Sequence, residues 1–376
     1  MTLPRATYRP AGAFRCSPVA GPIRCGMAAA AGTPDLPERD TGRDVRPGSD
    51  RAADPASLQT SLRTALILPP PLPPGSRVAM ISPSGPLHGP HELERAVATA
   101  ESLGWEVQVG RHAMQRTGYF AGDDVQRGDD LLAAIADDAI DGIWCLRGGY
   151  GAARLLPRLG APFLQQHPKV LLGYSDITAL HAAWQQAGLV SYHGPTARSP
   201  LSDFSRDSLV RAVQQQADSG GIAPDAQVIR GGLAHGRLAG GNLALVASLC
   251  GTPWAVDFNG AILVLEDINE ATYRIDRMLT QLRLAGSFHG CVGIAFGACT
   301  DCTDTTDDGT RSITAIVTEL ADALQVPTLL GIPVGHISDQ WTLPFGAMAT
   351  LDADTRTLRV DTTRHAASPF LTSPGT

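Results

Sequence analysis

Short apolar segments alternate with amphipathic helical segments through most of this chain, and this alternation restricts its possible folds more than any other feature. Residues 77–82 form an apolar segment that leads through a Ser/Pro/Gly turn into a helical stretch at 91–104. Further segments continue the pattern, helical at 125–139, 151–159 and 177–188 and apolar at 105–110, 141–149, 169–176 and 189–195. Alternation of this kind is typical of a parallel sheet with helices on both faces. We therefore predict an α/β fold with a doubly wound, mostly parallel sheet.

Composition divides the chain into five parts. We expect residues 1–68, which are rich in Ala, Pro, Arg, Gly and Asp and show no periodicity, to be disordered or to precede the true start of translation. Strands and helices alternate in both 69–198, the predicted N-terminal α/β domain, and 230–365, a smaller C-terminal α/β domain. Between them, 199–229 is polar and indicates a linker or a peripheral helix, and 366–376 is a tail. Because reactive groups in such sheets collect beyond the carboxyl ends of strands, we expect the active site between the two domains.

Charge, hydropathy and cysteine content exclude several classes of function. The formal charge of -7 arises from 37 acidic and 30 basic residues without a basic stripe, which argues against nucleic acid and anionic membranes as partners. No apolar run approaches the roughly 20 residues that span a bilayer. Seven cysteines, an odd number, indicate a reducing compartment, and we expect the cytoplasm. Cys299 and Cys302 form one C-x-x-C without a second cysteine pair or clustered histidines, so the sequence favours neither metal nor redox use of it.

Ser175 is the first candidate for catalysis. The segment VLLGYSDITAL delivers it from an apolar strand into a turn, and a helix is predicted to begin at Asp176. The hydroxyl would lie at the carboxyl end of a parallel strand, with the N–H of Asp176 directed at a developing oxyanion. The turn is similar to the G-x-S-x-G nucleophile elbow, although Ile177 replaces its second glycine. The alternative is that Ser175 or Asp176 only caps the helix, since both residue types favour N-cap positions.

A nucleophilic serine needs a base and a group that orients the base. Glu266 closes the apolar run AILVLE, and His336 closes TLLGIPVGH, so both polar side chains are predicted at strand ends. The chain order Ser, Glu, His is one of several in which such triads occur. Taken alone, Glu266 is equally well a surface carboxylate of the acidic turn EDINE, and His336 a loop histidine with its own partners.

The segment CLRGGYGAARLL places a glycine-rich turn after another strand. Its backbone N–H groups can approach a ligand without interference from a Cβ atom, which makes Gly149 a candidate second oxyanion donor. Arg147 and Tyr150 flank this position as candidate substrate-binding residues, and Lys169, the one lysine of the chain, is predicted at the far end of its strand. The alternatives are a tight turn without a ligand, and an internal ion pair of Arg147 that holds it.

Several segments together resemble one family in their order along the chain. They are ISPSGP, RGGYGAARLL, GYSDITAL, GGNLALVASLCGTPW, LVLEDINE, RMLTQL, VPTLLGIPVGH and TLPFGAMATLD. Between about Arg77 and Asp352 the chain resembles the LD-carboxypeptidases, a family that also includes the microcin C self-immunity peptidases.

This resemblance implies roles for the residues named above. It implies Ser175 as the nucleophile, Glu266 as the acid and His336 as the base of a catalytic triad. The backbone of Gly149 and Asp176 is implied as the oxyanion hole. No metal or cofactor is implied, and the family implies a homodimer.

The activity that follows is that of a serine carboxypeptidase in cell-wall recycling. It would cleave the bond between the L-centre of diaminopimelate, or another dibasic residue, and the terminal D-alanine of a small cytoplasmic muropeptide. One alternative is a microcin C-type amidase that cleaves peptidyl or aminoacyl adenylate analogues with the same triad. Another is a small-molecule binding protein without activity, against which the presence of all three triad residues argues.

Overall fold

A computed structural model of the protein describes residues 66–303 and 311–361. The expected tail at 366–376 and nearly all of the expected extension at 1–68 therefore lie outside the described residues. Ile67, at the start of the described chain, forms a parallel bridge with Leu189. No helix in the described part of the chain is long and apolar enough to cross a membrane.

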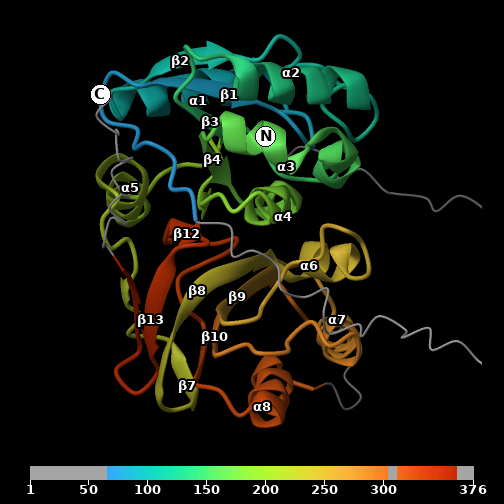
Figure 1. The fold of residues 1–376 in the computed structure, drawn as a ribbon, viewed down its shortest axis with the longest axis vertical. Helices are drawn as coiled ribbons and strands as arrows, with labels where there is room; N and C mark the ends of the chain where they lie inside the picture. The colour runs from blue at the N-terminus through green and yellow to red at the C-terminus, as the bar shows by residue number, and fades with distance from the viewer. Residues whose placement is uncertain (1–65, 304–310, 362–376) are drawn as a thin grey trace, which may run out of the picture. The chain divides into compact units, whose positions relative to one another are not determined.

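The first sheet is built from strand–helix units, as the alternation predicts. Its elements are β1 Arg77–Ile81, α1 Pro90–Ser102, β2 Glu106–Val109, α2 Asp124–Ala136, β3 Gly142–Cys145, a 3-10 helix Ala152–Arg158, α3 Ala161–Gln166, β4 Val170–Gly173, a 3-10 turn Ser175–Ile177, α4 Thr178–Gln186 and β5 Ser191–His193. The strand order is β12-β5-β4-β3-β1-β2, and every pair is parallel except β5 with β12 (Figure 1). The predicted doubly wound parallel sheet is confirmed.

Both faces of this sheet are buried. Val78 and Met80 of β1 point into a core shared with α1, whereas Ala79 and Ile81 point into a second core with α2 and α4. Successive side chains of a strand alternate between faces, so a strand covered on both sides has to be apolar throughout. β1 pairs with β2 on one side and β3 on the other, which places a topological switch point beside the carboxyl ends of β1 and β3.

The segment at 151–159 differs from the α-helix that its pattern predicts. The structure has a 3-10 helix there, with Pro157 inside it. Proline has no N–H to donate and its ring crowds the preceding turn, so it disfavours a regular α-helix.

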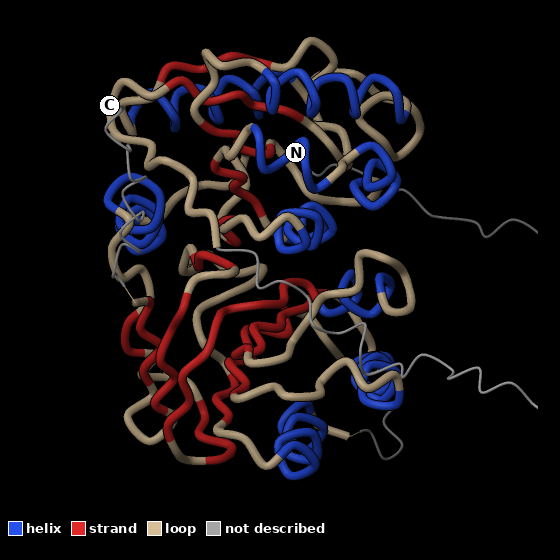
Figure 2. Tube along the Cα trace, viewed as in Figure 1, coloured by secondary structure: helices blue, strands red, loops and turns tan. Residues whose placement is uncertain are grey.

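The second half forms a mixed sheet of eight strands. The elements of this half of the chain are α5 Asp203–Leu209, a π-helix Val210–Gln215, β6 Gly221–Ile222, β7 Gln227–Arg230, β8 Leu233–Asn242, α6 Leu243–Leu249, β9 Ala261–Ile268, α7 Thr272–Leu284, β10 Gly293–Thr300, α8 Ile313–Leu324, β11 Thr328–Leu330, β12 Leu343–Phe345, β13 Met348–Asp352 and β14 Thr357–Val360. All of these strands except β12, which joins the first sheet, belong to the second sheet. The order is β6-β14-β13-β8-β9-β10-β11-β7, with β8 to β11 parallel. Figure 2 shows α6, α7 and α8 along one side of these strands.

Two short strands come from the segment 199–229, for which the sequence predicted a linker or a peripheral helix. The helix is present as α5, but β6 and the start of β7 also join the second sheet, where β6 pairs with β14 and β7 with β11. β6 and β7 contain no fully buried residue, so neither has the apolar run by which a strand is recognised in the sequence.

The two sheets share structure at two places. β12, late in the chain, adds to the first sheet through pairing with β5. One apolar core also contains side chains from both halves, such as Leu180 of α4 and Leu243 of α6. The carboxyl ends of β4 and β9, where the candidate residues lie, belong to these two sheets respectively.

Candidate active site

Ser175 occupies a strained turn directly after the carboxyl end of β4. Its φ of 65° lies in the left-handed region, which is uncommon for a residue with a Cβ atom. Gly148 packs against it, because a Cβ atom on Gly148 would lie 2.8 Å from Ser175 Cβ and 3.0 Å from its Oγ. The structure therefore places Ser175 in the elbow that the sequence predicts, with a glycine of the glycine-rich turn at its side.

Neither Ser175 nor Asp176 caps the following helix. The N-cap residue of the 3-10 turn is Tyr174 and that of α4 is Ile177, and no side-chain capping hydrogen bond is formed at either. The capping alternative therefore does not describe this turn, and the Ser175 hydroxyl is left for another role.

Glu266 and His336 meet although 70 positions separate them in the chain. Glu266 lies on β9 and is fully buried, and its Oε2 is 2.8 Å from Nδ1 of His336. The imidazole is partly exposed, at 16% of its side-chain surface. With the Nδ1 proton directed at Glu266, Nε2 is the nitrogen that can accept a proton. Full burial excludes the surface-carboxylate alternative for Glu266, and the short contact gives His336 the orienting partner that a catalytic base requires.

Glycine packing sets the position of this pair. Gly335 has a φ of 119°, and a Cβ atom on it would lie 2.9 Å from Glu266 Oε2 and 3.0 Å from Glu266 Cβ. The carbonyl of His336 accepts a hydrogen bond of 3.0 Å from the Thr300 hydroxyl at the end of β10. The loop that carries His336 is therefore held against β9 and β10.

Tyr174 connects the serine turn to the histidine. Its ring centroid is 4.7 Å from that of His336 and 6.1 Å from that of His193, which is fully buried. Burial, and then the nearby Glu266 carboxylate, raise the pKa of the Tyr174 phenol. Tyr174 immediately precedes Ser175, so the residue next to the nucleophile candidate packs on the ring of the base candidate. The sequence analysis missed this role, since an aromatic residue at a strand end is usually part of the core.

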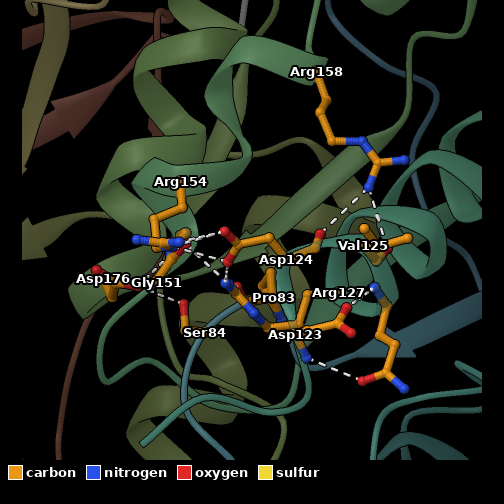
Figure 3. A network of polar contacts seen from close by, with 12 residues as sticks. Pro83, Ser84, Asp123, Asp124, Val125, Arg127, Gly151, Arg154, Arg158 and Asp176 are labelled. Atoms are coloured by element: carbon orange, nitrogen blue, oxygen red, sulfur yellow. Dashed lines mark hydrogen bonds and ion pairs between the residues drawn. The ribbon is translucent and has the colours of Figure 1, made fainter. Parts of the chain in front are cut away.

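A polar network joins Asp176, the residue after Ser175, to the segments around Ser84 and Gly151 (Figure 3). Oδ2 of Asp176 accepts hydrogen bonds from the Ser84 hydroxyl, at 2.6 Å, and from the N–H of Ala152, at 2.8 Å. The guanidinium of Arg127 donates to the carbonyls of Pro83 and Gly151. The carboxylate of Asp176 thus joins the loop after β1 to the turn after β3, across the topological switch point.

Burial shapes the electrostatics of this network. It raises the pKa of Asp176, against the hydrogen bonds from Ser84 and Ala152 that favour the charged form. Arg127 is 1% exposed, and burial lowers its pKa while its ion pair with Asp124 opposes that change. Sequence analysis had assigned only the backbone of Asp176; Ser84 lies in the segment ISPSGP that carries the family resemblance but was given no role, and Arg127 lies in no such segment.

The remaining candidates lie on the same turn. Gly149 is exposed with a φ of 113°, and it packs against Gly85. Arg147 donates to the carbonyl of Pro86, and burial lowers the pKa of its guanidinium. Within residues 66–303 and 311–361 no carboxylate lies at ion-pair distance from Arg147, so the ion-pair alternative is not observed. Tyr150 is half exposed and packs with other aromatic rings.

In the part of the chain that the structure describes, no three His, Cys, Asp or Glu side chains are placed to hold a metal ion. The site is instead built from a serine, a histidine–glutamate pair and a glycine-rich turn. In chemical terms this is a set of groups suited to acyl transfer.

Comparison with known proteins gives the family of the chain. Residues 78–194 match the model of the LD-carboxypeptidase N-terminal domain, and residues 235–351 match that of the C-terminal domain. A murein tetrapeptide carboxypeptidase of Pseudomonas aeruginosa is 35% identical over 291 residues, which cover 74% of this chain and 94% of the relative. A probable murein peptide carboxypeptidase of Bacillus subtilis is 32% identical over 295 residues, or 76% of this chain and 92% of the relative.

Solved structures give the same result for the fold. The crystal structure of a muramoyltetrapeptide carboxypeptidase from Oxalobacter formigenes has a TM-score of 0.68 and 30% identity, and the match covers 76% of this chain and 98% of that one. Both family models lie on the described sheets, and the two relatives cover about three quarters of the chain. The chain therefore belongs to the LD-carboxypeptidase family and is a serine-type carboxypeptidase.

Proposed function

We propose that this protein removes the terminal D-alanine from small muropeptides in the cytoplasm, by cleaving its bond to the L-centre of a dibasic residue. The observation that carries the proposal is the 2.8 Å contact between Glu266 and His336 beside the strained turn of Ser175. The names of the Pseudomonas aeruginosa and Oxalobacter formigenes relatives, murein tetrapeptide and muramoyltetrapeptide carboxypeptidase, supply the substrate class.

In the proposed reaction, Nε2 of His336 takes the proton of Ser175 as its Oγ attacks the carbonyl carbon. Glu266 fixes the imidazole through Nδ1 and stabilises the imidazolium that forms. His336 then protonates the leaving amine of D-alanine. Water, deprotonated by the same imidazole, releases the acyl group from Ser175.

The oxyanion of the tetrahedral intermediate requires N–H donors beside Ser175. We assign these to the backbone of Gly149 and Asp176. The support is that Gly148, the residue before Gly149, packs directly on the Ser175 side chain. A Cβ atom added to Gly148 would lie 3.3 Å from the backbone N of Asp176. The network around the Asp176 carboxylate would keep both donors in place before substrate arrives, which reduces the reorganisation that the reaction requires.

An exopeptidase must also bind the free carboxylate of its substrate. Arg147 is the proposed partner, with Tyr150 at the exposed edge of the same turn. Arg147 has no carboxylate at ion-pair distance among the described residues, whereas Arg198 is paired with Glu92 at 3.2 Å. A guanidinium in this state can bind a carboxylate through two parallel hydrogen bonds.

The nucleophile is tested with a fluorophosphonate probe. Wild-type protein should be labelled at Ser175, and Ser175→Ala should lose both the label and turnover, by several orders of magnitude in kcat. Ser338→Ala, which alters an exposed serine two residues from His336, serves as the control and should retain both. Equal labelling of Ser175→Ala and wild type would contradict the assignment.

The substrate is tested by mass spectrometry of the purified protein with two compounds supplied separately. One is a muropeptide tetrapeptide ending in D-alanine, and the proposal requires its conversion to tripeptide and free D-alanine. The other is aspartyl sulfamoyl adenosine, the compound bound in a solved structure of the microcin C7 self-immunity protein, which shares the fold at 24% identity and a TM-score of 0.71. Cleavage of the second compound alone would replace the proposed substrate with an adenylate analogue.

Carboxylate recognition is tested with Arg147→Met on a tetrapeptide ending in free D-alanine and on the same peptide amidated. A large loss on the free acid, with little change in the already poor amide rate, is expected. Arg283→Met, on an exposed arginine at the end of α7, is the control. An equal loss on both peptides would assign Arg147 to holding the turn.

We further propose that the protein acts as a homodimer, as the family implies. Light scattering during size-exclusion chromatography should give twice the chain mass of 39.4 kDa. A mass of one chain at micromolar concentration would reject this.

A further inference from the structure

Thr178 joins the turn that carries Ser175 to the second sheet, in which Glu266 lies. It is the first residue of α4, it follows the turn Ser175–Ile177 directly, and it is fully buried. Its N–H donates to the carbonyl of Ser175, so this residue closes the serine turn. Its hydroxyl accepts a hydrogen bond of 3.0 Å from the backbone N–H of Asn242, the last residue of β8. One side chain therefore connects the nucleophile candidate to the sheet of the acid candidate.

The hydroxyl of Thr178 does not serve its own helix. A threonine near the start of a helix commonly bonds to the backbone of that helix, but the N-cap of α4 is Ile177, and no side-chain capping bond forms there. Gly241, just before Asn242, packs closely on the threonine, since a Cβ atom on this glycine would lie 2.4 Å from Thr178 Oγ1. The contact between α4 and β8 therefore requires a residue without a Cβ atom at position 241.

Asn242 connects Thr178 to the end of β9 in two ways. In the parallel pairing of β8 with β9, Asn242 is the register partner of Glu266. Its side-chain amide also donates a 3.0 Å hydrogen bond to the carboxylate of Asp267, the next residue of β9. Asp267 is 2% exposed, and it accepts a further bond of 2.9 Å from the N–H of Ala244 in α6. The end of β9 is therefore fixed to the end of β8, and through β8 to Thr178.

The other contacts between the two halves act on different parts of the chain. The pairing of β12 with β5 holds the segment that follows His336, not the strand that bears Glu266. The core shared by Leu180 and Leu243 is apolar, and apolar packing is not directional. A hydrogen bond, in contrast, has a preferred length and angle. The bond at Thr178 is thus the contact suited to fixing the end of β8 at one position.

We propose that Thr178 is a positioning residue for the reaction at Ser175. Its hydroxyl sets where the Glu266–His336 pair lies relative to that serine. Because Thr178 is fully buried, it cannot itself touch the substrate. The expected effect on turnover rests on the triad proposed above, whereas the link from α4 to β8 and β9 is a contact of the structure in either case.

The size of the effect follows from the bond that would be lost. Without the hydroxyl, the N–H of Asn242, a residue that is 4% exposed, is left buried without its acceptor. An unpaired buried N–H is costly, so the end of β8 has to shift towards another acceptor. β9 moves with it, and the Glu266–His336 pair shifts relative to Ser175. Since a misplacement of about 1 Å can cost on the order of 100-fold in rate, we expect kcat to fall about 10- to 100-fold with KM unchanged.

Thr178→Val tests the proposal, because valine keeps the shape of threonine and lacks the hydroxyl. We would measure kcat and KM for the tetrapeptide, and the rate of fluorophosphonate labelling of Ser175, at a temperature where calorimetry shows the variant to be folded. We expect kcat and the labelling rate to fall together. If Thr178→Val does not fold, the smaller Thr178→Ala takes its place in the same comparison.

Thr178→Ser separates the hydrogen bond from packing. Serine keeps the acceptor oxygen but loses a methyl group, so the proposal predicts rates close to those of wild type. A role in packing alone predicts the reverse order, with serine more harmful than valine.

Thr342→Val is the matched control. Thr342 is also fully buried, and its Oγ1 has no hydrogen-bond partner among the described residues. The same substitution there removes a hydroxyl that holds no other group, so kcat and the labelling rate should equal those of wild type.

Each negative result has a separate meaning. Wild-type turnover and labelling in folded Thr178→Val would overturn the inference, and the labelling gives this result whatever the substrate is. Equal losses in Thr178→Val and Thr342→Val would also overturn it, since the effect would then belong to any buried hydroxyl. Failure of the wild-type protein to react with the probe at Ser175 would reject the triad itself, and the positioning role with it.

Discussion

The substitution Gly335→Ala tests whether glycine packing positions His336, the candidate base. Gly335 precedes His336, has a φ of 119°, and has Glu266 against the place where a Cβ atom would be. An alanine there meets Oε2 at 2.9 Å and Cβ of Glu266 at 3.0 Å. Carbon contacts are most favourable at about 3.5–4.0 Å, so Glu266 has to move by about half an ångström or more.

Two costs follow, and they are separable. Holding alanine in this backbone conformation costs on the order of 1–3 kcal/mol of folding stability. Moving Glu266 disturbs its hydrogen bond to His336, and a catalytic misplacement of this size lowers the rate by roughly 10- to 100-fold, equivalent to about 1.4–2.7 kcal/mol in activation free energy.

Gly232→Ala provides the matched control. Gly232 has the same φ of 119° but lies at the turn before β8, where an added Cβ atom meets Pro327 Cγ at 3.2 Å. Both variants should have a lower melting temperature by calorimetry. Only Gly335→Ala should have a lower rate of tetrapeptide cleavage at a temperature where both variants are folded. A Gly335→Ala variant with wild-type kcat/KM would refute the view that this glycine sets the geometry of the Glu266–His336 pair.

Three further predictions concern other parts of the site. Ser84→Ala removes the hydroxyl that donates a 2.6 Å hydrogen bond to the buried carboxylate of Asp176. We expect a kcat about 10-fold lower and a free energy of unfolding, measured in urea, about 1–3 kcal/mol lower, because that carboxylate loses a partner. An unchanged kcat would separate this network from catalysis. Glu266→Gln should lower kcat by orders of magnitude with little change in melting temperature, because an amide cannot stabilise the imidazolium of His336; a near-normal rate in a steady-state assay would reject Glu266 as the orienting acid. Burial lowers the pKa of His181, which is 2% exposed, to about 4. The unfolded state therefore binds more protons, and the protein should lose up to about 3 kcal/mol of stability as the pH falls from about 6.5 to 4. Unfolding of His181→Gln should depend less on pH in this window, and identical profiles for variant and wild type would show that the histidine does not titrate there.

The sequence predicted the first sheet well because its strands are covered on both faces. An apolar run such as VLLG at β4 is uniform enough to mark a strand, and the helix after it has a clear period. Ser175 could be placed at the strand end for this reason. The same reasoning failed for β6 (GI), β7 (QVIR) and β12 (LPF), which contain no apolar run of four residues and are recognisable as strands only through their partners.

The candidate site was less accessible to sequence reasoning because it depends on contacts between distant segments. Glu266 meets His336 only through the register of β9, β10 and the loop after β11. Ser84 reaches Asp176 across 92 positions of the chain, and neither residue type is unusual where it stands. Tyr174 had an apolar neighbourhood in the sequence, so nothing separated it from an ordinary core residue. What one strand end presents could be predicted, but which strand ends face each other could not.

The pairing of β12 with β5 has a consequence for the order in which activity arises during synthesis. The strand beside β5, in the sheet that bears Ser175, consists of residues 343–345, and the candidate base at 336 comes only shortly before them. A ribosome that has released the first 200 residues has therefore produced a nucleophile without its base and a sheet with an open edge. Contacts over such sequence distances form slowly. Hydrolytic activity should accordingly appear late, when the chain is almost complete and His336 and β12 have both been made.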